Sequence, residues 1–146
     1  MQRFQFRLAS VLKWRGLQLD VEKSKLQALF GERNRAIAGL ARLEDCRLEA
    51  NRILAAGSVD GQSLAALGEY RSSLQRSGEK IRAAAADCER RIAAQQQCLA
   101  EAERRVRLLE RLKERRLEEW NREAARELEA LASETFLAKW VREAKA

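Results

Sequence analysis

The fold of this chain is decided by residues 74–109, which read LQRSGEKIRAAAADCERRIAAQQQCLAEAERRVRLL. Positions reached by alternating steps of four and three from Leu74 are apolar at nine of eleven places, and Gly78 and Gln95 are the exceptions. The apolar members are Leu74, Ile81, Ala85, Cys88, Ile92, Leu99, Ala102, Val106 and Leu109. A seam of period 3.5 needs a partner helix and a left-handed supercoil, so this stretch predicts one helix of a coiled coil.

The partner helix is predicted to be the first part of the same chain. The same spacing runs from Leu8 to Leu54 with ten of fourteen positions apolar, and the polar exceptions are Arg15, Glu22, Arg33 and Arg47. Residues 55–63, AAGSVDGQS, form the only strong helix-breaking cluster between the two seams. Gly57 suits a left-handed helix end, and Asp60 or Ser63 suits the next N-cap. Because a short connection joins antiparallel neighbours, the pattern predicts an all-α, antiparallel two-helix coiled-coil hairpin.

We expect a single hairpin over 1–146, with helix 1 at about 4–55, a turn at 56–63 and helix 2 at about 64–141. Folding about residue 60 places Leu26 opposite about 94 and Leu8 opposite about 112. Helix 2 then overhangs, without a partner from the chain beyond about residue 117. The overhang carries a set of large apolar residues: Trp120, Leu128, Leu131, Phe136, Leu137, Trp140 and Val141. It either frays or folds back on Phe4, Phe6 and Trp14, or it docks another protein. We expect a monomeric hairpin, with pairing of the seams between two chains as the alternative.

Composition supports long helices over a compact domain. Ala, Glu, Lys, Leu and Arg supply 93 of the 146 residues, and proline is absent. The net charge of +7 favours acidic partners, but both signs are interleaved along the helices. The densest basic run, 104–116, therefore indicates a solvated face or a contact with an acidic protein, and we expect no nucleic-acid partner. No apolar run is long enough to predict a membrane span, and the basic N-terminus lacks the features of a secretory signal.

No motif for catalysis or for a metal was found. The chain has no histidine, no phosphate-binding glycine loop and no nucleophile elbow. The cysteines Cys46, Cys88 and Cys98 are odd in number and lack the spacing of a zinc site, so we interpret them as reduced cytosolic thiols. We expect no enzyme, no cofactor and no metal.

Four motifs occur in an order that resembles the flagellar FliJ family. They are Phe4-x-Phe6-Arg7-Leu8 with Leu12-Lys13-x-Arg15, then Tyr70-x3-Leu74-x6-Ile81, then Leu109-Glu110-x-Leu112-Lys113-Glu114-Arg115-Arg116, and last Glu127-Leu128-Glu129-Ala130-Leu131-Ala132. The resemblance covers essentially the whole chain. The stalk proteins of virulence type III secretion systems look similar too, and a general coiled-coil scaffold is a further alternative.

The resemblance implies a non-enzymatic stalk of the flagellar type III export apparatus, cytoplasmic and peripheral at the inner membrane. Such proteins insert into the export ATPase hexamer, contact the cytoplasmic domain of the export gate and handle export chaperones. Carried over by position, the gate contact is Tyr70, Leu74, Ser77 and Ile81. Ser77 departs mildly from the apolar or small residues of the family, and Leu74 and Ile81 also belong to the seam. The ATPase-ring contact is Phe4, Phe6, Arg7, Leu12 and Arg15 together with Trp120, Leu128, Leu131 and Trp140.

Overall fold

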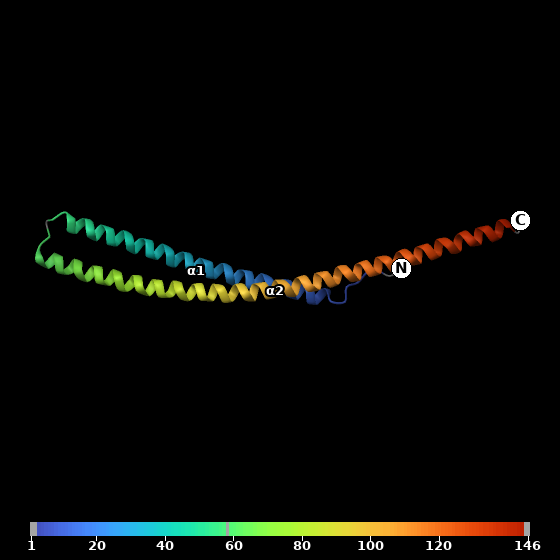
Figure 1. Ribbon diagram of the computed structural model, residues 1–146, viewed down its shortest axis with the longest axis horizontal. Helices are drawn as coiled ribbons and strands as arrows, with labels where there is room; N and C mark the ends of the chain where they lie inside the picture. The colour runs from blue at the N-terminus through green and yellow to red at the C-terminus, as the bar shows by residue number, and fades with distance from the viewer. Residues whose placement is uncertain (1–2, 58, 145–146) are drawn as a thin grey trace. The chain divides into compact units, whose positions relative to one another are not determined.

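Two long helices form most of the chain in the computed structural model, which describes residues 3–57 and 59–144. Helix α1 spans Ala9–Ala55 and helix α2 spans Gly61–Ala144 (Figure 1). Within these described residues there is no strand. The two helices pack against each other and have 47 and 84 residues. The predicted all-α class with helices of unequal length is therefore confirmed.

The turn between the helices uses the residues that the sequence indicated. Gly57 has a φ of 74°, in the left-handed region that glycine enters without a Cβ clash. Asp60 caps α2, because the Ser63 backbone N–H donates to Asp60 Oδ1 at 2.9 Å. The hydrogen bonds from Ser63 hold the pKa of the Asp60 carboxyl below its ordinary value. Of the two candidate N-caps, the structure selects Asp60.

Helix α1 starts later than the expected residue 4. Two backbone hydrogen bonds lead into the helix, from Ala9 N–H to Phe6 O at 3.1 Å and from Leu12 N–H to Leu8 O at 2.9 Å. No Ser, Thr, Asp or Asn precedes residue 9 to cap an earlier first turn. Residues 3–8 consequently precede the helix.

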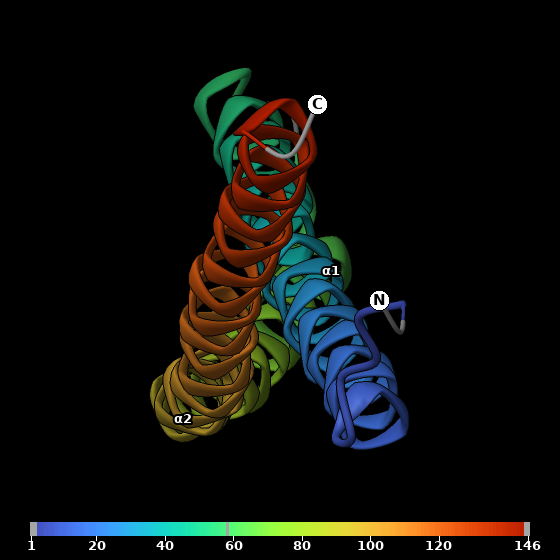
Figure 2. The ribbon, with the colours of Figure 1, turned by 90° about the vertical axis from the view of Figure 1, so that its right-hand side faces the viewer.

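The chain divides into two compact units. The tip unit is Asp20–Glu101, which contains the turn, and the terminal unit is Met1–Leu19 with Ala102–Ala146. In the tip unit, α1 and the first part of α2 run antiparallel beside each other (Figure 1). In the terminal unit, α2 continues without a break to its C-terminal end, drawn orange to red in Figure 2.

The core of the tip unit follows the predicted seams. Leu29, Cys88 and Ile92 are buried together, and Leu26 and Phe30 pack against them. Residues at equal distances from residue 60 face each other, as the hairpin register requires. Further along the pair, a Cβ built on Gly39 would lie 3.4 Å from Ile81 Cδ1, so the helices approach closely there.

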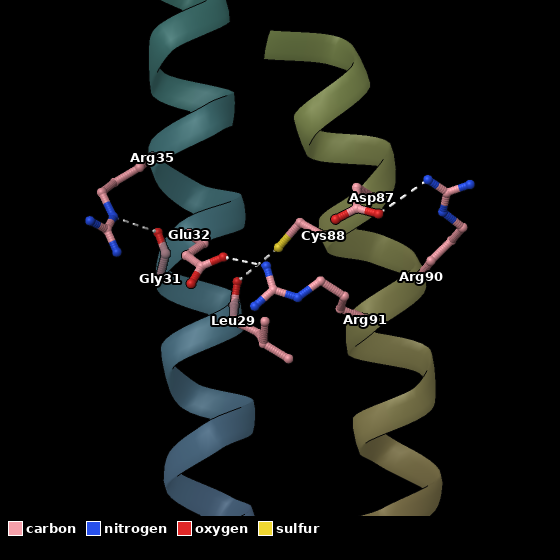
Figure 3. A network of polar contacts seen from close by, with 8 residues as sticks. All are labelled: Leu29, Gly31, Glu32, Arg35, Asp87, Cys88, Arg90 and Arg91. Carbon is pink, nitrogen blue, oxygen red and sulfur yellow. Dashed lines mark hydrogen bonds and ion pairs between the residues drawn. The ribbon is translucent and has the colours of Figure 1, made fainter. Parts of the chain in front are cut away.

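Polar contacts also join the two helices of the tip unit (Figure 3). The Cys88 thiol donates to Leu29 O at 3.3 Å, and Arg91 pairs with Glu32 at 3.0 Å. Two polar seam residues meet as well, since Gln95 Nε2 donates to the Glu22 backbone O at 3.2 Å and also to the Glu22 carboxylate. Hydrogen bonds from Lys25 and then from Gln95 lower the pKa of Glu22. A matched polar pair inside an apolar seam favours one register over its neighbours.

Candidate interaction surfaces

An aromatic pair anchors the residues that precede α1. The rings of Phe4 and Trp120 have centroids 6.1 Å apart and are tilted by 58°, a geometry that is favourable for aromatic contacts. Both side chains are half-buried, as is Phe6. The prediction that α2 has no partner from the chain beyond about residue 117 is therefore wrong by a few residues. An extended segment advances about 3.3 Å per residue against 1.5 Å in a helix, so residues 3–8 reach further along α2 than a helix would.

A cavity of about 830 Å³ lies in the terminal unit beside this pair. Leu8 and Leu112 both line it, as the predicted register about residue 60 requires. Its other lining residues are Arg3, Phe4, Gln5, Phe6, Arg7, Arg116, Glu119, Trp120 and Glu123. Aromatic and aliphatic side chains ringed by charged ones are typical of surfaces that bind another protein.

Three further residues of the predicted ATPase-ring contact lie just before α1 or in its first turns. Arg7 is exposed, whereas Leu12 and Arg15 are half-buried. The Arg15 guanidinium stacks over the Trp14 ring at 4.7 Å and donates to Gln18 Oε1 at 2.9 Å. Trp14 itself is 51% exposed, so this stacked pair presents an aromatic and a cationic group to solvent.

The C-terminal part of α2 presents large apolar side chains to solvent. Leu128 and Leu131 are 60% and 57% exposed, and Trp140 is 62% exposed. Among the described residues after 110, Ala124 alone is buried. The apolar residues do not form the single set assumed from the sequence. At about 100° per residue, Leu128 and Leu131 share one side of the helix, and Trp140 lies about 150° away. The five-residue step from 131 to 136 moves Phe136, Leu137, Trp140 and Val141 to the opposite side.

The predicted gate contact forms one stripe on α2 in the tip unit. Tyr70, Leu74, Ser77 and Ile81 fall within about 60° of each other around the helix. Tyr70 is 44% exposed, whereas the other three are half-buried because the same face packs against α1. Leu74 lines a cavity of about 590 Å³ together with Leu40 and Leu43. The exposed end of the stripe is therefore its tyrosine.

Cys46 on α1 lies beside that tyrosine. A hydrogen bond with the Cys46 side chain and the charge of its thiolate raise the pKa of Tyr70, and desolvation adds to the effect. Sequence reasoning did not connect these two residues. The register about residue 60 places position 46 opposite 74, one turn from Tyr70, and is the signal that would have found the contact.

Grouped metal ligands, buried polar residues and membrane-spanning stretches are all absent from the described residues. In 3–57 and 59–144, no group of three or more His, Cys, Asp or Glu side chains is placed to hold a metal ion. No polar or charged residue is buried in the same ranges. Neither helix, as far as it is described, has a stretch apolar and long enough to cross a bilayer.

Comparison of the chain with models of known protein families identifies its family. The family model described as "Flagellar FliJ protein" matches residues 4–132. The matched range contains the predicted gate contact and most of the predicted ATPase-ring contact. Trp140 and the neighbouring Phe136, Leu137 and Val141 lie outside it. No curated protein and no solved structure matches the chain.

Proposed function

The chain belongs to the flagellar FliJ protein family, and we propose that it couples the export ATPase ring to the export gate of the flagellar type III apparatus. Family membership supports an export-related, non-catalytic coiled-coil stalk protein, which is a cytoplasmic component of the apparatus. The proposal adds the partners, namely the ATPase hexamer, the cytoplasmic domain of the gate and the export chaperones. It also adds peripheral attachment at the inner membrane through those partners. The observation that carries it is the match over residues 4–132.

The proposed ring contact is the terminal unit. Leu128 and Leu131 offer an apolar face to solvent. This face begins about two turns of α2 after Trp120, whose ring packs against Phe4. A single helix cannot bury such a face by itself, so a partner that covers it gains the free energy of apolar burial. Arg7 and the stacked Arg15 add positive charge on the same unit. These features suit a contact with the inner wall of a protein ring.

The proposed gate contact is the exposed end of the stripe in the tip unit. Tyr70 supplies aromatic area and a hydroxyl, and such residues often dominate the free energy of binding at protein interfaces. Leu74, Ser77 and Ile81 flank it and stay partly accessible. Replacing Tyr70 by alanine is expected to weaken binding of the isolated gate domain while leaving ring binding unchanged.

The ring contact is tested by titrating the purified export ATPase with this protein and measuring ATP hydrolysis. We expect stimulation by the wild type and loss of stimulation with Leu128→Ala/Leu131→Ala. Trp120 is a less suitable position because its removal would also release Phe4. The matched control is Leu48→Ala/Ile53→Ala, since those residues are also exposed, at 48% and 47%, but belong to the tip unit. Absence of both stimulation and binding by the wild type would contradict the proposed function. Equal loss in both variants would contradict the proposed location.

A further inference from the structure

Four arginines form a row along α2 in the terminal unit. They are Arg104, Arg107, Arg111 and Arg115, and we name this row the arginine ridge. At about 100° per residue they fall within about 80° of each other, and the row is about 16 Å long. The half-buried seam residues Val106 and Leu109 lie on the other side of the helix. The ridge therefore faces away from the seam.

Most of this positive charge is unpaired. Arg107 pairs with Glu103 at 3.2 Å, but no hydrogen bond or ion pair within the described part of the chain engages Arg104, Arg111 or Arg115. All four are exposed. Leu108 sits among them with 59% of its surface exposed, and together with Arg104, Arg107 and Arg111 it lines a hollow of about 320 Å³. The ridge is thus a row of guanidinium groups with an apolar side chain at one edge.

This arrangement has an energetic cost in the free protein. Like charges four residues apart destabilise a helix, and Arg107, Arg111 and Arg115 follow one another at that spacing. Other arginines of α2 avoid the cost by pairing, as Arg116 does with Glu119 at 2.9 Å. A negatively charged partner would relieve the repulsion along the ridge.

Carboxylates beside the ridge restrict the shape of that partner. Glu103, Glu110 and Glu114 lie along one flank of the ridge, within about 60° of its edge around the helix. Just past Arg115, Glu118 continues the line of the ridge and Glu119 lies on its other side. A broad polyanion, such as duplex DNA or an anionic bilayer, would meet these carboxylates together with the arginines. A single row of acidic side chains that ends at Arg115 would meet the arginines with fewer of these carboxylates.

We propose that the arginine ridge binds a narrow acidic segment of another protein, such as one helix face carrying a row of Asp or Glu. Guanidinium groups suit this partner because each takes a carboxylate through two parallel hydrogen bonds. Leu108 adds an apolar contact that a protein segment matches better than a phosphate chain does. This surface is separate from Leu128 and Leu131, so the proposal does not depend on the contact with the ATPase ring.

The test uses the full chain and two labelled, alanine-rich helical peptides of the same composition. One carries Glu at the four relative positions of the ridge arginines, and the other spreads the same Glu residues around the helix. Binding is followed by fluorescence anisotropy at low and physiological salt. We expect tighter binding of the row peptide, weakened about 10- to 100-fold by Arg104→Gln/Arg111→Gln/Arg115→Gln, since each lost pair contributes modestly. The control Arg42→Gln/Arg71→Gln/Arg76→Gln removes as much charge from exposed arginines of the tip unit and should leave binding unchanged.

Three results would overturn the proposal. The first is equal binding of the two peptides, and the second is an equal loss in the ridge variant and the control variant. The third is ridge-dependent binding of a DNA duplex, or of vesicles containing phosphatidylglycerol, that is as tight as binding of the row peptide. Circular dichroism of both variants establishes that the helices remain formed.

Discussion

The tip unit and the terminal unit use the same α2 helix in opposite ways. In the tip unit, Leu29, Cys88 and Ile92 are each less than a tenth exposed, because α1 covers the seam. In the terminal unit, Ala124 is the buried residue among those described, and Leu128 and Leu131 are more than half exposed. One helix thus carries a face buried within the chain and, further along, an apolar face exposed to solvent.

The difference shows where the free energy of folding comes from. Apolar burial stabilises the tip unit, and the matched pair of Glu22 and Gln95 adds specificity of register. The C-terminal turns of α2 gain little from burial, so their helical state depends on local propensity, which is marginal in water for a short helix. We therefore expect the proposed ring contact to lie in the part of the chain that opens most easily.

The largest contrast is expected between truncations of a buried and of an exposed leucine. Leu29→Ala should lower the free energy of unfolding by about 2–4 kcal/mol, because it removes buried surface and leaves a cavity. Leu128→Ala should change it by less than about 0.5 kcal/mol. Urea unfolding followed by the helical circular-dichroism signal measures both. Similar costs for the two variants would mean that Leu128 is covered in solution, for example by a second chain.

Two glycine-to-alanine substitutions should have effects of intermediate size and opposite sign on the stability of the fold. A Cβ added at Gly31 or at Gly57 would meet nothing within 4 Å, so space does not distinguish them. Gly31 lies inside α1, where alanine should stabilise by about 0.5–1 kcal/mol. Gly57 has a φ of 74°, and alanine there should destabilise by about 1 kcal/mol. Thermal midpoints of the two variants measured side by side check the pair. A stabilising Gly57→Ala would show that α1 ends in another way.

The fold of the tip unit could be predicted from the sequence because the features that determine it are local and periodic. The 3–4 spacing located the seams, and the Gly57 and Asp60 positions located the ends of the helices. The antiparallel register followed from the short connection. Each of these features depends on a few neighbouring residues, so the amino-acid order is sufficient to predict it.

The terminal unit was harder to predict because its contacts lie outside helical periodicity. The residues before Ala9 pack through Phe4 against Trp120, a contact between residues distant in sequence in a segment without a repeat. Trp140 and Leu128 lie on opposite sides of α2 because five residues separate Leu131 from the next large apolar residue, Phe136. This spacing is visible in the sequence, but treating all the apolar residues as one stripe hides it. The proposed binding roles of the two surfaces involve other proteins, and the chain alone does not encode the shapes of those partners.

The smallest expected effect is a dependence of tip-unit stability on pH. Hydrogen bonds lower the pKa of Asp60 and of Glu22 below their ordinary values of 3.8 and 4.5, so these carboxyls release protons more readily in the folded chain. Their contribution to the stability of the fold is therefore present above the ordinary pKa values. It is lost as the pH falls through the lowered pKa values of the folded chain.

Tyr70 acts in the opposite range. Cys46 raises the pKa of Tyr70 above the ordinary 10.0, so the contribution of Tyr70 to stability is present below that value and is lost as the pH rises through the raised pKa.

Thermal midpoints measured from about pH 7 down to about pH 2 should fall, and Asp60→Asn with Glu22→Gln should flatten that fall. Tyr70→Phe should flatten the alkaline side alone, because it removes the ionisable hydroxyl and keeps the ring. An unchanged acid side in the double variant would mean that the cap and the Glu22–Gln95 contact are already open in solution. The register would then depend on apolar burial alone.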